Sequence, residues 1–172
     1  VPALKVHPMV LGSDGLDLFP ASVADMDFRA PKPVLEAMAQ RLAHGIFGYE
    51  TVPSGLMPAF TAWMASRHSW DIHPDHILRA PNVLNSLSMA ANLFTNAGDG
   101  IIIQPPVFFD FANIISENQR CLIENPLIFS EGHYEMDYDG LEACAADPRT
   151  KMLFLCNPHN PVGRVWTRSE LV

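Results

Sequence analysis

The stretch KMLFLCNPHNPVGR, residues 151–164, decides how the rest of the chain can be interpreted. An apolar run from Met152 to Cys156 ends at Asn157-Pro158, and a polar loop with a second Asn-Pro step follows. Proline fixes φ and removes a backbone donor, so this loop holds its Asn side chains in preset directions. A buried strand that ends in a polar loop is where open α/β sheets bind ligands. An ordinary strand-to-helix turn is the alternative, since Asn and Pro are common turn residues.

Outward from this loop, strands and helices alternate. Apolar runs predict strands at residues 77–79, 101–103, 121–123 and 152–156, and a small hairpin at 127–129 and 133–136. Helical spacing predicts helices at residues 83–95, from about 107 to 119, at 137–146, and from Thr167, where Glu170 completes a capping box. This order predicts an α/β fold with a mostly parallel sheet and helices on both faces.

Two further helices are expected before this alternation. Pro31-Lys32-Pro33 leads into the first, which Gly45 ends, and Ser54 caps the second, which ends near residues 68–70. The chain begins without Met and stops about one turn into the helix that Thr167 opens, so we expect a truncated piece of a longer protein.

Composition excludes several classes of protein. The chain has 172 residues, 48% hydrophobic and 17% charged, which suits one domain with a sizeable core. Its formal net charge of −8 disfavours binding to nucleic acid or to an anionic membrane. No apolar run reaches the roughly 18 residues that a membrane span needs. With no leader-like opening, we expect a cytoplasmic protein.

Cysteine and histidine usage gives no metal site. The three cysteines, Cys121, Cys144 and Cys156, are odd in number and lack metal-like spacing, so we interpret them as reduced core residues. His68, His73 and His76 lie around a proline without helical i, i+4 spacing, which favours solvated loop residues over ligands.

Candidate binding residues follow successive strand ends. The turn at residues 80–83 opens a helix, whose free N–H groups and dipole can hold a phosphate, although no GxGxxG or P-loop pattern is present and a plain helix start is the alternative. Phe108 follows the Pro105-Pro106 strand stop and can stack on a flat ring, or it belongs to the core with its neighbouring phenylalanines. With Asn160 at the same sheet edge, these groups suggest a planar, phosphorylated cofactor.

Four motifs carry a resemblance to a known family. VADMDF (23–28), HGIFGYE (44–50), GDGIIIQPPVFF (98–109) and CNPHNPVGRVWT (156–167) occur in this order. They resemble fold type I pyridoxal-phosphate (PLP) enzymes of the class I/II aminotransferase superfamily, within the cystathionine β-lyase/MalY-PatB branch. The resemblance implies an N-terminal arm and small-domain segment at residues 1–45 and a partial PLP-binding large domain at 46–172.

The resemblance also implies roles for residues around the cofactor. Backbone N–H groups near Asn82, Val83 and Leu84 would bind the PLP phosphate, where the family usually has Gly-Val-Val. Phe108 would stack on the pyridine ring, where Tyr is more frequent, and Asn160 would bond the phenolic oxygen O3′.

Three more residues receive roles from the same resemblance. Tyr49 would reach the phosphate of the neighbouring subunit's cofactor, which implies a homodimer with shared active sites. Ala24 and Asp25 would line the region of the substrate carboxylate.

The implied activity is that of a PLP-dependent C–S β-lyase, which cleaves cystathionine or cysteine conjugates to a thiol, pyruvate and ammonia. An aminotransferase of the same fold and a non-catalytic regulatory homologue are the alternatives. PLP chemistry needs a Schiff-base lysine. None of Lys5, Lys32 and Lys151 lies in the family's lysine motif, which we expect beyond Val172, so this chain is expected to be inactive and poorly soluble alone.

Overall fold

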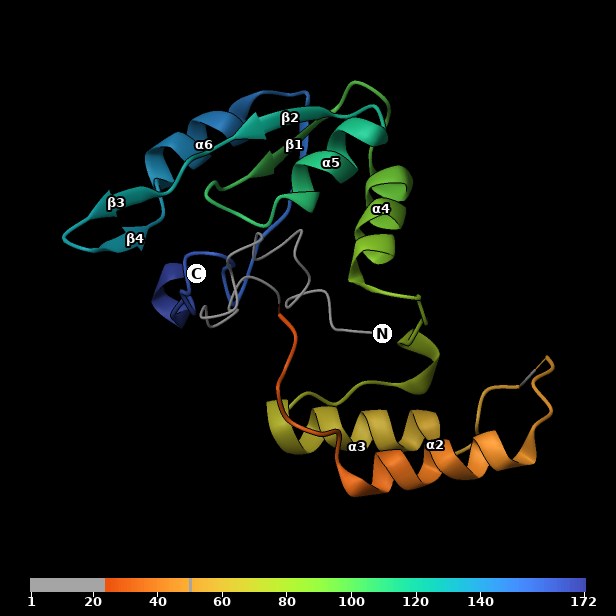
Figure 1. Cartoon of the computed structure of the whole chain (residues 1–172). Coiled ribbons are helices and arrows are strands. Elements are labelled where there is room, and N and C mark those ends of the chain that lie inside the picture. Colours follow the sequence, from red (N-terminus) through yellow and green to blue (C-terminus); the bar gives the residue numbers. More distant parts are fainter. Residues whose placement is uncertain (1–23, 50) are drawn as a thin grey trace, which may run out of the picture. The chain divides into compact units, whose positions relative to one another are not determined.

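A computed structural model describes residues 24–49 and 51–172 of the chain (Figure 1). The chain divides into two compact units that meet between Leu56 and Met57, and each unit is described by itself. Most of the predicted N-terminal arm lies outside the described residues. The predicted division into residues 1–45 and 46–172 stays a prediction.

In the first unit, helix α2 spans Lys32–His44. Pro31 precedes it in an extended conformation, and Gly45 ends it with a φ of 74°, a left-handed conformation that glycine adopts without steric cost. Arg41 and His44 lie in the last turn, where the positive charge of Arg41 complements the helix dipole. The predicted helix and its glycine stop are confirmed.

Helices α3 (Leu56–His68) and α4 (Val83–Phe94) flank a short 3₁₀ helix at Pro74–His76. The strand predicted at residues 77–79 is absent, and this prediction was wrong. The backbone at Ile77 is extended, with φ −105° and ψ 115°, but the segment joins no ladder among the described residues. Leu78 is accordingly 91% exposed. An extended apolar segment becomes a strand only where a partner accepts its hydrogen bonds.

The central sheet has the strand order β2-β1-β5. Strands β1 (Gly100–Ile103), β2 (Cys121–Glu124) and β5 (Thr150–Leu153) run parallel, with α5 (Asp110–Glu117) between β1 and β2 in the chain and α6 (Tyr138–Ala146) before β5. Strands β3 (Ile128–Ser130) and β4 (His133–Glu135) form the predicted hairpin. The predicted α/β fold with a parallel sheet is confirmed.

Strand β1 is buried on both faces, as its uniform isoleucines predict. Ile101 and Ile103 pack in one core cluster with Ala91 of α4 and with Phe111 and Ile115 of α5. Each fully buried isoleucine contributes about 1.5–3 kcal/mol to the stability of the fold.

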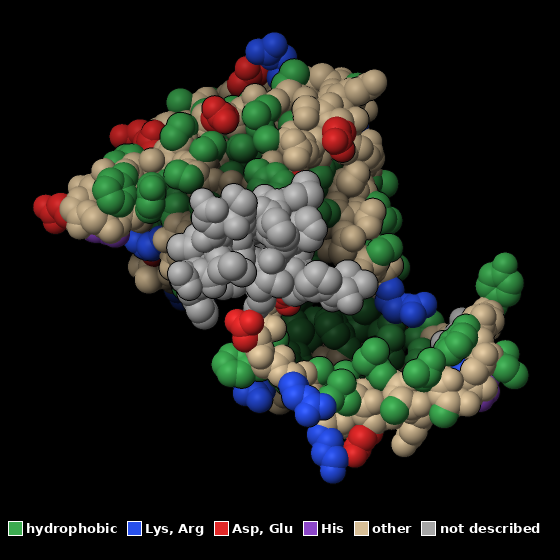
Figure 2. Space-filling model, viewed as in Figure 1, with side chains coloured by type: hydrophobic (Ala, Val, Ile, Leu, Met, Phe, Trp, Pro, Cys, Tyr) green, Lys and Arg blue, Asp and Glu red, His purple; other side chains and the backbone are tan. Residues whose placement is uncertain are grey.

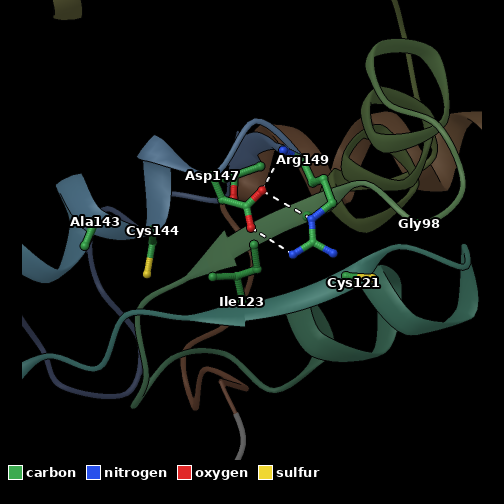
Figure 3. A pocket seen from close by; sticks show the side chains of 9 residues that line it. Gly98, Cys121, Ile123, Ala143, Cys144, Asp147 and Arg149 are labelled. Carbon is green, nitrogen blue, oxygen red and sulfur yellow. Dashed lines mark hydrogen bonds and ion pairs between the residues drawn. The ribbon is translucent and has the colours of Figure 1, made fainter.

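Helix α6 packs on the opposite face of the sheet. Side chains alternate between the two faces along a strand. Ile101 and Ile103 face α4 and α5, so Gly100 lies on the other face of β1. There Gly100 and Ile123 line a cavity of about 510 Å³ together with Ala143 and Cys144 of α6 (Figure 3). The sheet therefore carries helices on both faces.

The cysteines are free, and none is fully buried as the sequence suggested, although Cys156 packs against the core cluster. Cys121 is exposed, and Cys144 and Cys156 are half-buried. Cys121 begins strand β2, which pairs with β1 and with no other strand of the described ranges, and Cys144 lines the open cavity under α6. Apolar neighbours in the sequence therefore did not imply burial.

None of the helices in the described ranges combines the length and the apolar character that crossing a membrane requires.

Candidate functional site

The carboxyl ends of β1 and β5 lie at one edge of the sheet, because the two strands are parallel neighbours. The segment after β1 carries Pro105-Pro106 and Phe108, and the loop after β5 carries Asn160. A direct bond joins these segments: Nε2 of His159 lies 3.1 Å from the Pro106 carbonyl oxygen. The structure thus brings the segments of Phe108 and Asn160 together, as the sequence predicted.

The loop after β5 is closed by its own backbone. The His159 N–H donates to the Arg164 carbonyl at 2.7 Å, and the Gly163 N–H donates to the His159 carbonyl at 2.8 Å. Gly163 has a φ of 73°, a left-handed conformation that is unfavourable for residues with a side chain. The Asn160 position therefore sits on a turn with fixed ends.

The two asparagines of this loop have different surroundings. The Asn157 side chain accepts from the Trp166 N–H at 3.2 Å, and the Trp166 indole donates to the Cys156 carbonyl at 3.0 Å. The Asn160 side chain is exposed and bonds to no other group within the described residues. Its backbone N–H points to the Cys156 sulfur at 3.4 Å. Asn157 closes the loop, and Asn160 presents an available amide.

His159 is a residue that sequence reasoning missed. Its side chain is 1% exposed, and its ring meets that of Trp166 edge-on, at 5.5 Å and 83°. Burial lowers the pKa of His159, outweighing the nearby carbonyls of Pro106 and Gln104, so the ring is neutral at neutral pH. Nε2 faces the Pro106 carbonyl, which can only accept, and Nδ1 has no hydrogen-bond partner among the described residues, so the single proton belongs on Nε2. A histidine between two Asn-Pro steps was the available signal, but polar loops are usually solvated.

Arg164 fixes the far end of the loop. Its guanidinium donates to the Tyr134 carbonyl of β4 at 2.8 Å, pairs with Glu170, and lies 4.6 Å above the Trp166 ring. The Glu170 carboxylate accepts from the Thr167 N–H at 2.7 Å, which is the glutamate arm of the predicted capping box. The Thr167 backbone and hydroxyl, with the Arg164 pair, lower the pKa of Glu170.

The start of α4 offers unpaired donors. Asn82 caps the helix, accepting from the Asn85 N–H at 2.9 Å. The amides of Val83 and Leu84 donate to no acceptor in the part of the chain that the structure describes. Such N–H groups at the positive end of a helix dipole suit an anion.

The α4 start lies near the same edge of the sheet. Leu84 and Phe108 pack against one core cluster, and Asn82 and Asp110, the first residue of α5, line one groove of about 320 Å³. Asn82 and Leu84 therefore lie beside the segment after β1 that carries Phe108.

Phe108 is half-buried rather than fully in the core. Its ring lies 5.0 Å from that of Phe109 and meets that of Phe111 edge-on at 6.2 Å. Packing against the core fixes its orientation, while part of the side chain stays accessible. Both interpretations of this residue find support, and its stacking role stays a prediction.

Ala24, Asp25 and Tyr49 belong to the first unit, where all three are exposed. They are described apart from the strand-end residues of the second unit. Their predicted roles at the substrate carboxylate and at a neighbouring cofactor stay predictions.

The cavity under α6 is distinct from this edge. It lies around the first residues of the three parallel strands, Gly100, Cys121 and Thr150, whereas the predicted site lies beyond the last residues. Its charges are paired, because Arg149 donates to Asp147 at 2.9 Å and lowers the pKa of that carboxyl (Figure 3).

The parallel sheet, the helix start and the asparagine loop define a member of a known class. Residues 21–172 match the family described as aminotransferase class I and II, and the chain belongs to this family.

Individual members of the family resemble this chain in sequence and in structure. The chain is 44% identical to cystathionine β-lyase PatB of Bacillus subtilis (strain 168) over 156 residues, 91% of this chain and 40% of that protein. Cystalysin of Treponema denticola, whose crystal structure contains pyridoxal 5′-phosphate, matches with a TM-score of 0.85 and 35% identity, over 97% of this chain and 45% of that one. The PLP-bound C–S lyase of Staphylococcus hominis matches with a TM-score of 0.80 and 31% identity, over 87% and 38%. The chain thus spans about two fifths of its relatives' length.

Proposed function

We propose that this chain supplies one wall of the cofactor site in a PLP-dependent C–S β-lyase. The observation that carries the proposal is a set of donors without an acceptor among the described residues: the amides of Val83 and Leu84 at the start of α4 and the side chain of Asn160 after β5. These groups fit a phosphate and a phenolic oxygen, and the aromatic ring of Phe108 fits a planar heterocycle.

Each residue has a defined task in this proposal. Val83 and Leu84 donate to the phosphate with the help of the α4 dipole. Asn160 donates to O3′, and Phe108 restrains the ring by stacking. PLP supplies an electron sink for negative charge next to the substrate's amino group. The chain's own residues hold and orient the cofactor. None of its lysines lies in the family's lysine motif.

Further parts of the proposal rest on residues of the first unit. Tyr49 reaches the cofactor phosphate of a second copy in a homodimer, and Ala24 and Asp25 line the site of the substrate carboxylate. Exposure of the Tyr49 side chain is compatible with contact to another subunit. A cytoplasmic location agrees with the free thiols.

The choice of a lyase over an aminotransferase is supported by the similarity to PatB and to the Staphylococcus hominis C–S lyase. Product analysis of the full-length protein with cystathionine tests it. A thiol and pyruvate released without an added keto acid mean lyase. Turnover that requires a keto acid means aminotransferase, and a protein without turnover or PLP absorbance is a non-catalytic homologue.

Replacing Asn160 by alanine tests the cofactor contact itself. We expect Asn160→Ala in the full-length protein to weaken PLP retention about tenfold and to shift the absorbance of the bound cofactor, because one hydrogen bond to a charged oxygen is lost. Asn96→Ala, an exposed asparagine that precedes β1 at the opposite edge of the sheet, is the matched control. An unchanged spectrum in Asn160→Ala contradicts the O3′ role.

A further inference from the structure

The Pro105-Pro106 segment after β1 has few ways to be held in place. Proline has no N–H, so neither residue can donate a backbone hydrogen bond. Both of its carbonyls are used instead: Pro105 accepts from the Leu127 N–H at 2.7 Å, and Pro106 accepts from His159 at 3.1 Å. The position of this segment, and with it that of Phe108, depends on donors from elsewhere in the chain.

His159 connects that segment to the asparagine loop. Its side chain reaches across 53 positions of sequence to Pro106, while its own N–H and carbonyl close the loop on Arg164 and Gly163. The next residue is Asn160. One buried residue is therefore fixed at both ends, to the turn that carries Asn160 and to the segment that leads to Phe108.

We propose that His159 is a positioning residue that sets the Asn160 amide against the Phe108 segment by donating its Nε2–H to the Pro106 carbonyl. This inference rests on the proposed PLP function. His159 acts through its neighbours and contacts neither cofactor nor substrate, because its side chain is 1% exposed. The edge-on contact with Trp166 supplies packing, whereas the hydrogen bond to Pro106 supplies the alignment.

Two substitutions in the full-length protein separate alignment from packing. His159→Phe keeps a ring against Trp166 but leaves the Pro106 carbonyl without its donor, and His159→Gln keeps a donor. We expect His159→Phe to weaken PLP binding about tenfold. We also expect it to move the pH midpoint of the bound cofactor's absorbance in the same direction as Asn160→Ala. His159→Gln should restore most of the PLP affinity and most of the pH midpoint. If the ring mattered only for packing, His159→Gln would not restore them.

The outcomes distinguish this inference from the proposed function. If Asn160→Ala changes the spectrum while His159→Phe binds PLP like the unaltered protein, the positioning role is wrong and the proposed function stands. If the unaltered protein binds no PLP, the positioning role and the proposed function are both wrong. If His159→Phe does not fold, ¹⁵N NMR of the unaltered protein decides. A neutral ring with its proton on Nε2 across neutral pH supports the inference, and a charged ring or a proton on Nδ1 overturns it.

Discussion

Glu170 makes the end of the asparagine loop sensitive to acid at the scale of a single residue. The Thr167 N–H and hydroxyl donate to its carboxylate and lower the pKa of Glu170, with a further contribution from Arg164. Because the pKa is lower in the folded state than in the unfolded state, the stabilising contribution is complete above the ordinary glutamate pKa of about 4.3. That contribution is lost as the pH falls through the lowered pKa of the folded state.

We therefore expect the Thr167 amide signal to titrate below the ordinary glutamate range in an NMR pH series. Glu170→Gln should abolish this titration, because an amide does not ionise. Glu135→Gln, which alters a carboxylate paired with His133, should leave it unchanged. A Thr167 midpoint at or above the ordinary glutamate value would contradict the assignment.

At the scale of elements, the first turn of α4 combines capping and anion binding. Asn82→Ala should cost about 1 kcal/mol in the free energy of unfolding, since it removes the acceptor for the Asn85 N–H. Asn82→Asp should keep that stability, because a carboxylate also caps, but it adds negative charge beside the amides proposed for phosphate. We therefore expect PLP to bind at least tenfold more weakly to Asn82→Asp, by about 1.4 kcal/mol or more.

Denaturant unfolding and calorimetric titration with PLP measure the two effects separately. Asn82→Ser is the control, because serine caps the helix without charge and should preserve both. Equal PLP affinity in Asn82→Asp and the natural chain would show that phosphate does not bind at this helix start.

Local patterns predicted most elements, and a missing long-range partner explains where they failed. Strand β1 was predicted correctly because three consecutive isoleucines are buried whichever face they point to. Residues 77–79 look similar in sequence but have no neighbour to pair with in the described chain. Pairing is a property of distant residues, which apolar character in one segment does not reveal.

The candidate site was predicted only in outline, because element order shows which segments meet. Strand ends of a parallel sheet share an edge, so the meeting of the Phe108 and Asn160 segments followed from element order. The turn at Asn82 does not follow a strand, because the one predicted at residues 77–79 is absent from the described chain. The burial of His159 and the loop-closing bond of Asn157 depend on contacts with Pro106 and Trp166, which spacing does not encode. The sequence therefore predicted which segments meet, but not which side chains hold them.

At the scale of the whole molecule, apolar side chains reach the surface of both units (Figure 2). Leu78, Val83, Leu93 and Phe109 are strongly exposed within the second unit. Monomeric soluble proteins rarely leave large apolar patches uncovered. The chain also spans only about 40% of the length of PatB.

We expect the 172-residue chain expressed alone to self-associate. Size-exclusion chromatography with light scattering should give species well above the 19.0 kDa of one copy. The full-length protein should elute as a single defined species under the same conditions. A monodisperse 19.0 kDa form of the 172-residue chain that melts cooperatively would contradict this expectation.

The surroundings of Trp166 give the asparagine loop its own optical reporter. Trp166 is 4% exposed, against 55% for Trp63 and 58% for Trp70. An aqueous quencher will therefore extinguish the emission of the two α3-region indoles first and leave a short-wavelength component from Trp166. Since that indole bonds to the Cys156 carbonyl and touches the His159 ring, its fluorescence lifetime follows any movement of the loop. The natural chain needs no added dye for such a measurement.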